Sequence, residues 1–299
     1  MPDSLASRLA FFGRVADDLR REPAWRGEFR VRLDAPPQEA LYKHDGHFTF
    51  LDLPASPTAY EFELLDGLFQ GRRFSKGLPS AAPVEISYDG EDEIYVSINT
   101  VNSVTKQITF DPIAFLPRIR RGSAVLGAGG FSATLAEELA GVDATTALLT
   151  GVAGLAAGDL LRIVRSQCLR AKAGPYYPFP GGLTLLRLQV VEDSAAEPPL
   201  AKARAEVVEV NGIVPSSTSV GGVALRHVTI GAQVLVLGTS TDMEAFTETR
   251  GNAVLYFPGA WPLAALELAV SCTGYVTKNL VVAIGAGVIT PAKVKLVPV

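Results

Sequence analysis

The sequence is poor in cysteine and in charge, and each shortage excludes a class of protein. Its 299 residues include two cysteines, Cys168 and Cys272, which is too few for a disulfide framework or a cysteine-type zinc site. A single long-range disulfide between them stays open. Charged residues make up 19% and apolar residues 48%, which excludes a disordered chain and supplies the cores of about two to three domains.

Long apolar runs and blocks of positive charge are also missing. Lys and Arg number 27 against 31 Asp and Glu, a net charge of −4, so the chain lacks the basic surface that nucleic acid requires. The least charged stretches, 144–158, 210–225 and 279–292, are shorter than the roughly 18–20 residues of a membrane helix. They contain Gly, Pro or Thr, and they predict buried strands rather than a membrane span.

Charged residues interrupt the first 21 residues and leave only 9–12 as an apolar run, which predicts no secretory signal peptide and synthesis in the cytoplasm. The apolar residues here recur at spacings of three and four, so we predict an amphipathic helix over 1–25, ended by Pro23. Such a helix either covers the neighbouring domain or docks on another subunit. The residues expected on its apolar face are Leu5, Leu9, Phe12, Val15 and Leu19.

From Phe29 the apolar period becomes two, which is typical of strands with one wet face. Phe29, Val31 and Leu33 alternate with arginines, and similar strands follow around residues 60–64 and 94–98. Short strands between Gly, Pro and Asp turns predict a first antiparallel sandwich over 26–115.

Residues 116–180 differ from this pattern, and we predict a small β-rich connector there. It contains the glycine loop Gly127–Gly130, a short helix around 135–139, a strand near 160–163 and a proline-rich linker from residue 174 onward. Period-two strands return over 181–299 and predict a second sandwich. The predicted fold class is therefore mainly β: two immunoglobulin/transthyretin-like antiparallel sandwiches, a small β-rich module between them and an N-terminal amphipathic helix.

The two sandwiches share a weak repeat of turn glycine, alternating strand, proline and alternating strand. The first copy begins at Asp45-Gly46 and the second at Arg250-Gly251. At these residues the chain resembles carboxypeptidase regulatory-like domains, which are transthyretin-like sandwiches. The segment Pro199-Leu200-Ala201-Lys202-Ala203 is similar to that family's entry into its second strand. The resemblance covers about two thirds of the chain and implies modules without catalytic residues.

Enzyme-like and metal-binding patterns are few. The glycine loop Gly127–Gly130 could hold a phosphate, but Ser132 takes the place of a third glycine and no βαβ series follows. His44 and His47 flank a tight turn, and the acidic run 89–93 could attract calcium; solvated turns explain both. We therefore expect no catalytic residue, no cofactor and no metal site.

The candidates that remain concern partner binding. Tyr176, Tyr177 and Phe179 stand beside prolines and could form a platform for a glycan or a peptide, or pack a linker between domains. Arg118, Arg120 and Arg121 form a basic patch that faces an acidic partner or a domain boundary.

Taken together, these patterns predict a non-enzymatic structural or adaptor protein. Its expected partners are other protein subunits of an assembly, among them a second copy of itself, and by analogy of architecture the assembly is a phage-tail-like contractile injection particle. The alternative is a glycan- or peptide-binding module, and the third hypothesis is a nucleotide-binding enzyme that uses the Gly127–Gly130 loop.

Overall fold

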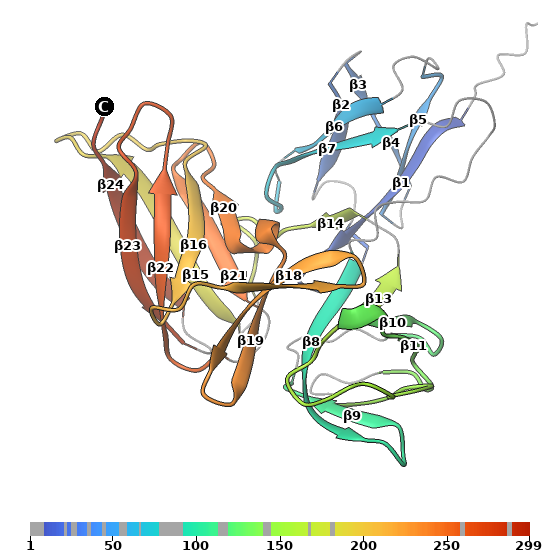
Figure 1. The fold of residues 1–299 in the computed structure, drawn as a ribbon. Helices are drawn as coiled ribbons and strands as arrows, with labels where there is room; N and C mark the ends of the chain where they lie inside the picture. Colours follow the sequence, from blue (N-terminus) through green and yellow to red (C-terminus); the bar gives the residue numbers. More distant parts are fainter. Residues whose placement is uncertain are drawn as a thin grey trace, which may run out of the picture. The chain divides into compact units, whose positions relative to one another are not determined.

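The computed structural model is mainly β, which confirms the predicted fold class (Figure 1). The only helical elements among the described residues are two short 3-10 turns, η1 (Ala128–Gly130) and η2 (Ser240–Met243). No helix in this part of the chain is long and apolar enough to cross a membrane. The described residues are 9–20, 23–24, 29–34, 37–43, 46–53, 59–65, 67–77, 92–112, 119–139, 145–166, 169–179, 183–257, 261–285 and 289–299.

The chain folds as two compact units. The first unit comprises Met1–Asp92 together with the return segment Ser166–Tyr177, and the second comprises Glu93–Arg165 and Pro178–Val299. The predicted division at 25, 115 and 180 stays a prediction.

The first unit is a sandwich of two four-stranded sheets, in the orders β14-β1-β5-β4 and β3-β2-β6-β7. The rings of Phe50 and Phe62, one from each sheet, lie 5.3 Å apart between centroids and fill the core. The strands are β1 (Leu9–Asp17), β2 (Arg30–Leu33), β3 (Gln38–Glu39), β4 (Leu41–Tyr42), β5 (His47–Leu51), β6 (Ala59–Leu65), β7 (Arg72–Gly77) and β14 (Leu169–Ala171).

The predicted N-terminal helix over 1–25 is wrong over its described part, which consists of strand β1, the turn 18–20 and residues 23–24. This strand lies between two others: it pairs antiparallel with β5 and parallel with β14. Gly13 lies opposite Phe48 in this ladder, and a Cβ at Gly13 would overlap the Phe48 ring. The three-and-four spacing of apolar residues is a weak local preference, and pairing on both edges of β1 overrides it.

The first part of the second unit is a sheet of six strands that closes on itself. Its order is β11-β10-β13-β8-β9-β12, and a bridge between Leu135 and Leu149 joins the two end strands. Closure leaves no free edge, and the apolar side chains, Ile98, Ile108 and Phe110 among them, fill the interior. The strands are β8 (Asp92–Asn102), β9 (Gln107–Phe110), β10 (Ala124–Gly127), β11 (Ser132–Thr134), β12 (Thr146–Leu148) and β13 (Leu160–Ser166).

The short helix expected around 135–139 is also wrong. Leu135 and Leu139 are buried, and they bridge to Leu149 and Ile119 respectively, so this segment is extended. Residues that local spacing assigned to a helical turn thus pair with neighbouring strands of the closed sheet.

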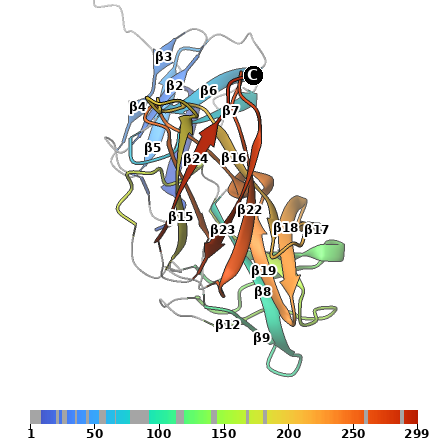
Figure 2. The same ribbon diagram turned by 90° about the vertical axis from the view of Figure 1, so that its left-hand side faces the viewer.

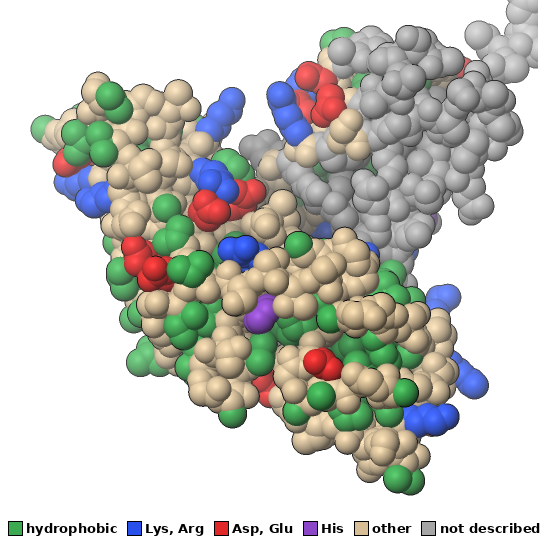
Figure 3. Space-filling view, in the orientation of Figure 1, with side chains coloured by type: hydrophobic (Ala, Val, Ile, Leu, Met, Phe, Trp, Pro, Cys, Tyr) green, Lys and Arg blue, Asp and Glu red, His purple; other side chains and the backbone are tan. Residues whose placement is uncertain are grey.

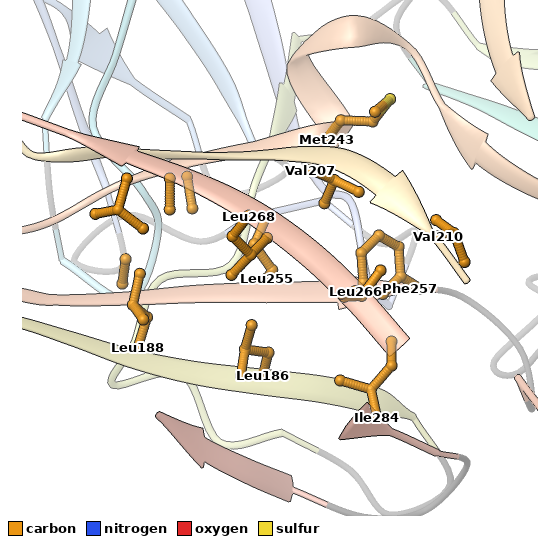
Figure 4. Close-up of a cluster of buried hydrophobic side chains, with 14 of the residues drawn as sticks. Leu186, Leu188, Val207, Val210, Met243, Leu255, Phe257, Leu266, Leu268 and Ile284 are labelled. Atoms are coloured by element: carbon orange, nitrogen blue, oxygen red, sulfur yellow. The ribbon is translucent and has the colours of Figure 1, made fainter. Parts of the chain in front are cut away.

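The second part of the second unit is a sandwich of the sheets β21-β15-β24 and β20-β16-β22-β23. Its core lies between the two sheets (Figure 4). Strands β15 and β24 run parallel, from the pair Leu185 and Ile289 to the pair Glu192 and Leu296 (Figure 2). The strands are β15 (Thr184–Glu192), β16 (Arg204–Val210), β20 (Glu244–Phe246), β21 (Asn252–Phe257), β22 (Ala264–Ser271), β23 (Lys278–Ile284) and β24 (Ile289–Leu296).

A three-stranded meander connects β16 to β20. It consists of β17 (Ser216–Val220), β18 (Val223–Ile230) and β19 (Gln233–Gly238). Leu235 and Leu237 reach the sandwich core, whereas Val234 and Val236 pack against a second apolar cluster with Leu160 and Leu225. The meander is therefore held on both faces.

Candidate partner-binding surfaces

The apolar residues predicted at the N-terminus for partner contact lie partly inside the first unit. Val15 is fully buried in β1, and Leu19 is buried in the turn that follows. Leu9 and Phe12 belong to β1, but their side chains lie outside the described part of the chain. Leu5 lies wholly outside it. Val15 and Leu19 are thus used by the fold of this unit.

Tyr177 is buried beside these residues and is bound to Asp17. Its hydroxyl donates a hydrogen bond to Asp17 Oδ2, while Asp17 Oδ1 accepts from the backbone N–H groups of Leu19 (2.8 Å) and Arg20 (3.2 Å). The Arg20 guanidinium lies 5.2 Å from the centre of the Tyr177 ring. Burial, reinforced by the bond to Asp17, raises the pKa of the Tyr177 hydroxyl well above its usual value. The segment that returns to the first unit is anchored there by this bond.

The other two aromatic candidates have different surroundings. Phe179 packs against Tyr256 of the second unit with 5.7 Å between ring centroids, and Tyr176 is 50% exposed. Phe179 is half-buried and Tyr177 is 2% exposed, so Tyr176 is the most accessible of the three rings.

A buried ion pair inside the second unit was missed by the sequence analysis. Glu93, assigned from sequence to a solvated acidic turn, is 1% exposed and pairs with Arg162 of β13. Tyr95 donates a second hydrogen bond to Glu93 (2.7 Å), and Arg162 also donates to the carbonyl of Gly221 (2.7 Å). Gly221 forms the β17–β18 turn, so the pair fastens the meander to the closed sheet. The alternation of Glu93 and Tyr95 with Ile94 and Val96 was the available signal that Glu93 belongs to a strand.

The glycine loop lacks the geometry of a phosphate site. It joins β10 to β11 as a hairpin, with Leu126 paired to Ser132, and no helix follows it. Gly129 and Gly130 have φ values of 64° and 82°, which explains glycine at a tight turn. The phosphate site expected from the sequence was a glycine loop at a helix N-terminus, and the described residues after this loop form a strand instead.

No group of three metal-ligating side chains occurs within the described residues. His47 and Asp52 belong to the described residues, whereas His44 and residues 89–91 of the acidic run do not. Cys272 carries a free thiol, and Cys168 lies outside the described part. Arg120 and Arg121 of the predicted basic patch are exposed on the closed-sheet part, and Arg118 is not described.

The outer face of the sheet β20-β16-β22-β23, which we call the acidic face, combines negative charge with exposed apolar groups. Glu209 of β16 and Glu267 of β22 are neighbours in the ladder, although like charges opposite each other are unfavourable. Figure 3 shows acidic and hydrophobic side chains side by side over this sheet. Its charged residues are Arg204, Glu206, Glu209, Glu244 and Glu267.

Several exposed apolar side chains belong to β23 and to the segments next to β16 and β22. Val281 is 65% exposed on β23, and Leu263 is 80% exposed just before β22. Ile213 and Val214, which follow β16, are also exposed. Asn211, directly after β16, accepts a hydrogen bond from the N–H of Ala265 (2.7 Å), which holds this segment beside β22. These side chains are candidates for contact with another protein, because exposed apolar patches often mark such surfaces.

On the opposite sheet, Glu197 accepts from two lysines of β24. Lys293 pairs with Glu197 Oε2, and Lys295 lies 2.6 Å from Oε1. Hydrogen bonds from Lys293 and Lys295 lower the pKa of Glu197 to about 2. These ion pairs link the turn that contains Glu197 to β24.

No protein-family model matches the sequence, and no curated protein matches it. Several solved structures align with much of the chain. The pilus 2b backbone protein of group B streptococcus is 12% identical, with 80% of this chain and 93% of that chain covered and a TM-score of 0.28. The major pilin subunit BcpA of Bacillus cereus is 10% identical, with coverage of 97% and 99% and a TM-score of 0.24. The pilus backbone RrgB of Streptococcus pneumoniae is 7% identical, with coverage of 97% and 88% and a TM-score of 0.23. TM-scores of this size are too low to carry a conclusion on function.

Proposed function

We propose that this chain is a non-enzymatic structural or adaptor subunit of a multi-protein assembly. The observation that carries the proposal is the exposure of the apolar side chains Val281, on β23, and Leu263, just before β22, in the second unit. Burial of exposed apolar side chains such as these under a partner gains free energy. The side chains of the neighbouring acidic face would orient that partner.

The finer proposals concern the kind of module and the kind of particle. The motifs at Gly46 and Gly251 support a carboxypeptidase regulatory-like origin for the sandwiches, which implies no catalytic residues. A series of β modules with only two cysteines is compatible with a phage-tail-like contractile particle assembled in the cytoplasm.

The test is recovery of partners with a surface-matched pair of variants. Tagged wild-type chain, Leu263→Lys and Val104→Lys are expressed in the native host, purified gently and analysed by quantitative mass spectrometry. Val104 is 89% exposed in the β8–β9 turn, away from the surface in question, and serves as the control. We expect other subunits in fixed ratios with wild type and Val104→Lys, and at least about tenfold less with Leu263→Lys. Equal recovery with all three would contradict the proposed surface.

The glycan- or peptide-binding alternative receives less support. Tyr177, which that hypothesis needs, is 2% exposed and bonded to Asp17. The nucleotide hypothesis needs a helix after Gly130, where the structure has strand β11.

A further inference from the structure

We propose that Asn211 is a site of spontaneous deamidation, which the native fold keeps inactive and which reacts when the turn after β16 opens. Asn211 is followed by Gly212, and none of the chain's other four asparagines precedes a glycine. A glycine nitrogen is the least hindered nucleophile that a backbone offers, because the residue carries no side chain. The inference does not depend on the proposed assembly role.

The reaction takes place between these two neighbouring residues. The backbone nitrogen of Gly212 attacks Asn211 Cγ and gives up its proton, while the bond from Cγ to Nδ2 breaks and ammonia leaves with that proton. The product is a five-membered succinimide ring. Water then opens the ring at either of its two carbonyls, which yields aspartate or isoaspartate at position 211. The only co-reactant is water.

The structure holds the two residues in a hairpin turn. The N–H groups of Val210 and Ile213 each donate to the carbonyl of the other, at 2.9 and 3.0 Å. Asn211 and Gly212 have φ values of 51° and 73°, so both central residues are left-handed. This is the type I′ turn, which the sequence Asn-Gly favours. Both residues are exposed, so water reaches them.

This turn keeps the reacting atoms apart. Ring closure requires the Gly212 nitrogen and Asn211 Cβ on the same side of the Cα–C bond of Asn211. In a type I′ turn, ψ at the first central residue is about 30°, which rotates that nitrogen about 150° away from Cβ around this bond. The nitrogen reaches Cγ only after ψ changes, and that change breaks the hydrogen bonds between Val210 and Ile213.

Asn211 is also held by strand β22. Its N–H donates to the Ala265 carbonyl (2.8 Å), and the Ala265 N–H donates to Asn211 Oδ1 (2.7 Å). These two bonds add to the free energy needed to open the turn, so the rate of deamidation reports how often this end of β16 opens. Isoaspartate has one more carbon in its main chain, and it would prevent the original pairing with Ala265 from forming again.

The first test compares the folded and the unfolded full chain. Wild type is incubated in mildly alkaline buffer with and without guanidinium chloride, and aspartate and isoaspartate at position 211 are quantified by peptide mapping with mass spectrometry. We expect the unfolded chain to deamidate at this position at least about tenfold faster than the folded chain. The other four asparagines are the internal reference, and they should convert more slowly than Asn211 in the unfolded chain.

The second test compares Ile213→Pro with Ile213→Ala in native buffer. Proline removes the N–H that closes the turn, whereas alanine keeps it, and both substitutions remove the same exposed side chain. We expect deamidation at position 211 to be at least about tenfold faster in Ile213→Pro than in Ile213→Ala. Circular dichroism and thermal unfolding check that both variants fold.

Three results would overturn the inference. Equal rates in folded and unfolded wild type, or equal rates in the two folded variants, would show that the turn does not control the reaction. No conversion at position 211 in the unfolded chain would remove the site itself. If Ile213→Pro does not fold, the comparison of folded with unfolded wild type decides alone.

Discussion

The Tyr177 hydroxyl donates a hydrogen bond to the Asp17 carboxylate, although 160 positions separate the two residues in the sequence. Both side chains are buried, and Asp17 also holds the backbone of the turn after β1. The bond ties the return segment, residues 166–177, to the first strand of the chain. Tyr177, which the sequence presented as a candidate for partner contact, is thus bonded to the strand that contains the buried Val15.

Tyr177→Phe removes the hydroxyl, so the buried Asp17 Oδ2 loses this hydrogen-bond donor. We expect a loss of about 1–3 kcal/mol in the free energy of unfolding. Hydrogen exchange should increase in peptides that cover β1 and residues 169–177. The matched control is Tyr176→Phe, because Tyr176 is 50% exposed, and its effect should be close to zero. Equal effects of the two substitutions would contradict the buried bond.

The same hydroxyl predicts how stability depends on alkaline pH. The pKa of Tyr177 is raised in the folded state, so folding favours the protonated hydroxyl. That contribution is complete below the unfolded pKa of about 10 and is lost as pH rises towards the folded pKa. Denaturant titrations above pH 10 should show a steeper loss for wild type than for Tyr177→Phe, and parallel curves would count against the assignment.

Gly13→Ala distinguishes the observed strand from the predicted helix by the sign of its effect. In a helix interior, alanine is more stable than glycine by about 1 kcal/mol. In β1, the new methyl group would overlap the Phe48 ring, so we expect a loss of about 1–3 kcal/mol. Chemical denaturation measures the change, and Gly151→Ala, where a Cβ meets no atom within 4 Å, is the control. A stabilised Gly13→Ala chain would contradict the strand.

Arg162→Met should be strongly destabilising, because it leaves the buried Glu93 carboxylate without its cation. We expect a loss of about 3–5 kcal/mol, and the double variant Glu93→Leu with Arg162→Met should regain much of it. Arg204→Met is the comparison, since the Arg204 side chain is 42% exposed and its ion pairs should contribute less than about 1 kcal/mol. A double-mutant cycle by denaturation gives the coupling energy, and additive single effects would show that the pair is uncoupled.

The carboxyl group of Glu197, at the surface, should titrate at unusually low pH. Its pKa is lowered to about 2 by Lys293 and Lys295, so its contribution to stability is present above the unfolded value of about 4.3 and is lost as pH falls towards 2. Carboxyl-carbon NMR should follow this titration, and Lys293→Met should move it back towards the ordinary value. High salt should weaken the shift, because the group is at the surface.

Alternating apolar residues located many strands correctly. Phe29 to Leu33 predicts β2, Leu186 to Val190 predicts β15, and Leu266 to Val270 predicts β22. The period of two survives because each of these strands buries one face against a core. The same reasoning supplied the mainly β fold class.

Long-range pairing could not be predicted in this way. The parallel neighbours β1 with β14 and β15 with β24 join segments far apart in sequence, and nothing local encodes that choice. The closure of the six-stranded sheet depends on a bridge between Leu135 and Leu149, which local spacing placed near a helix. Glu93 was missed because an acidic run is ordinarily solvated, and its cation, Arg162, comes from 69 positions away.

The central claim is that this chain works by contact with other protein subunits. The most direct measurement is the identity and ratio of the proteins that co-purify with it from the native host. The tagged full chain is purified gently, and co-purifying proteins are quantified by mass spectrometry against a tag-only control. The account predicts other subunits in fixed ratios to this chain, with recovery reduced by Leu263→Lys and unchanged by Val104→Lys. Recovery of the chain alone, at concentrations where the host assembles it, would contradict the account.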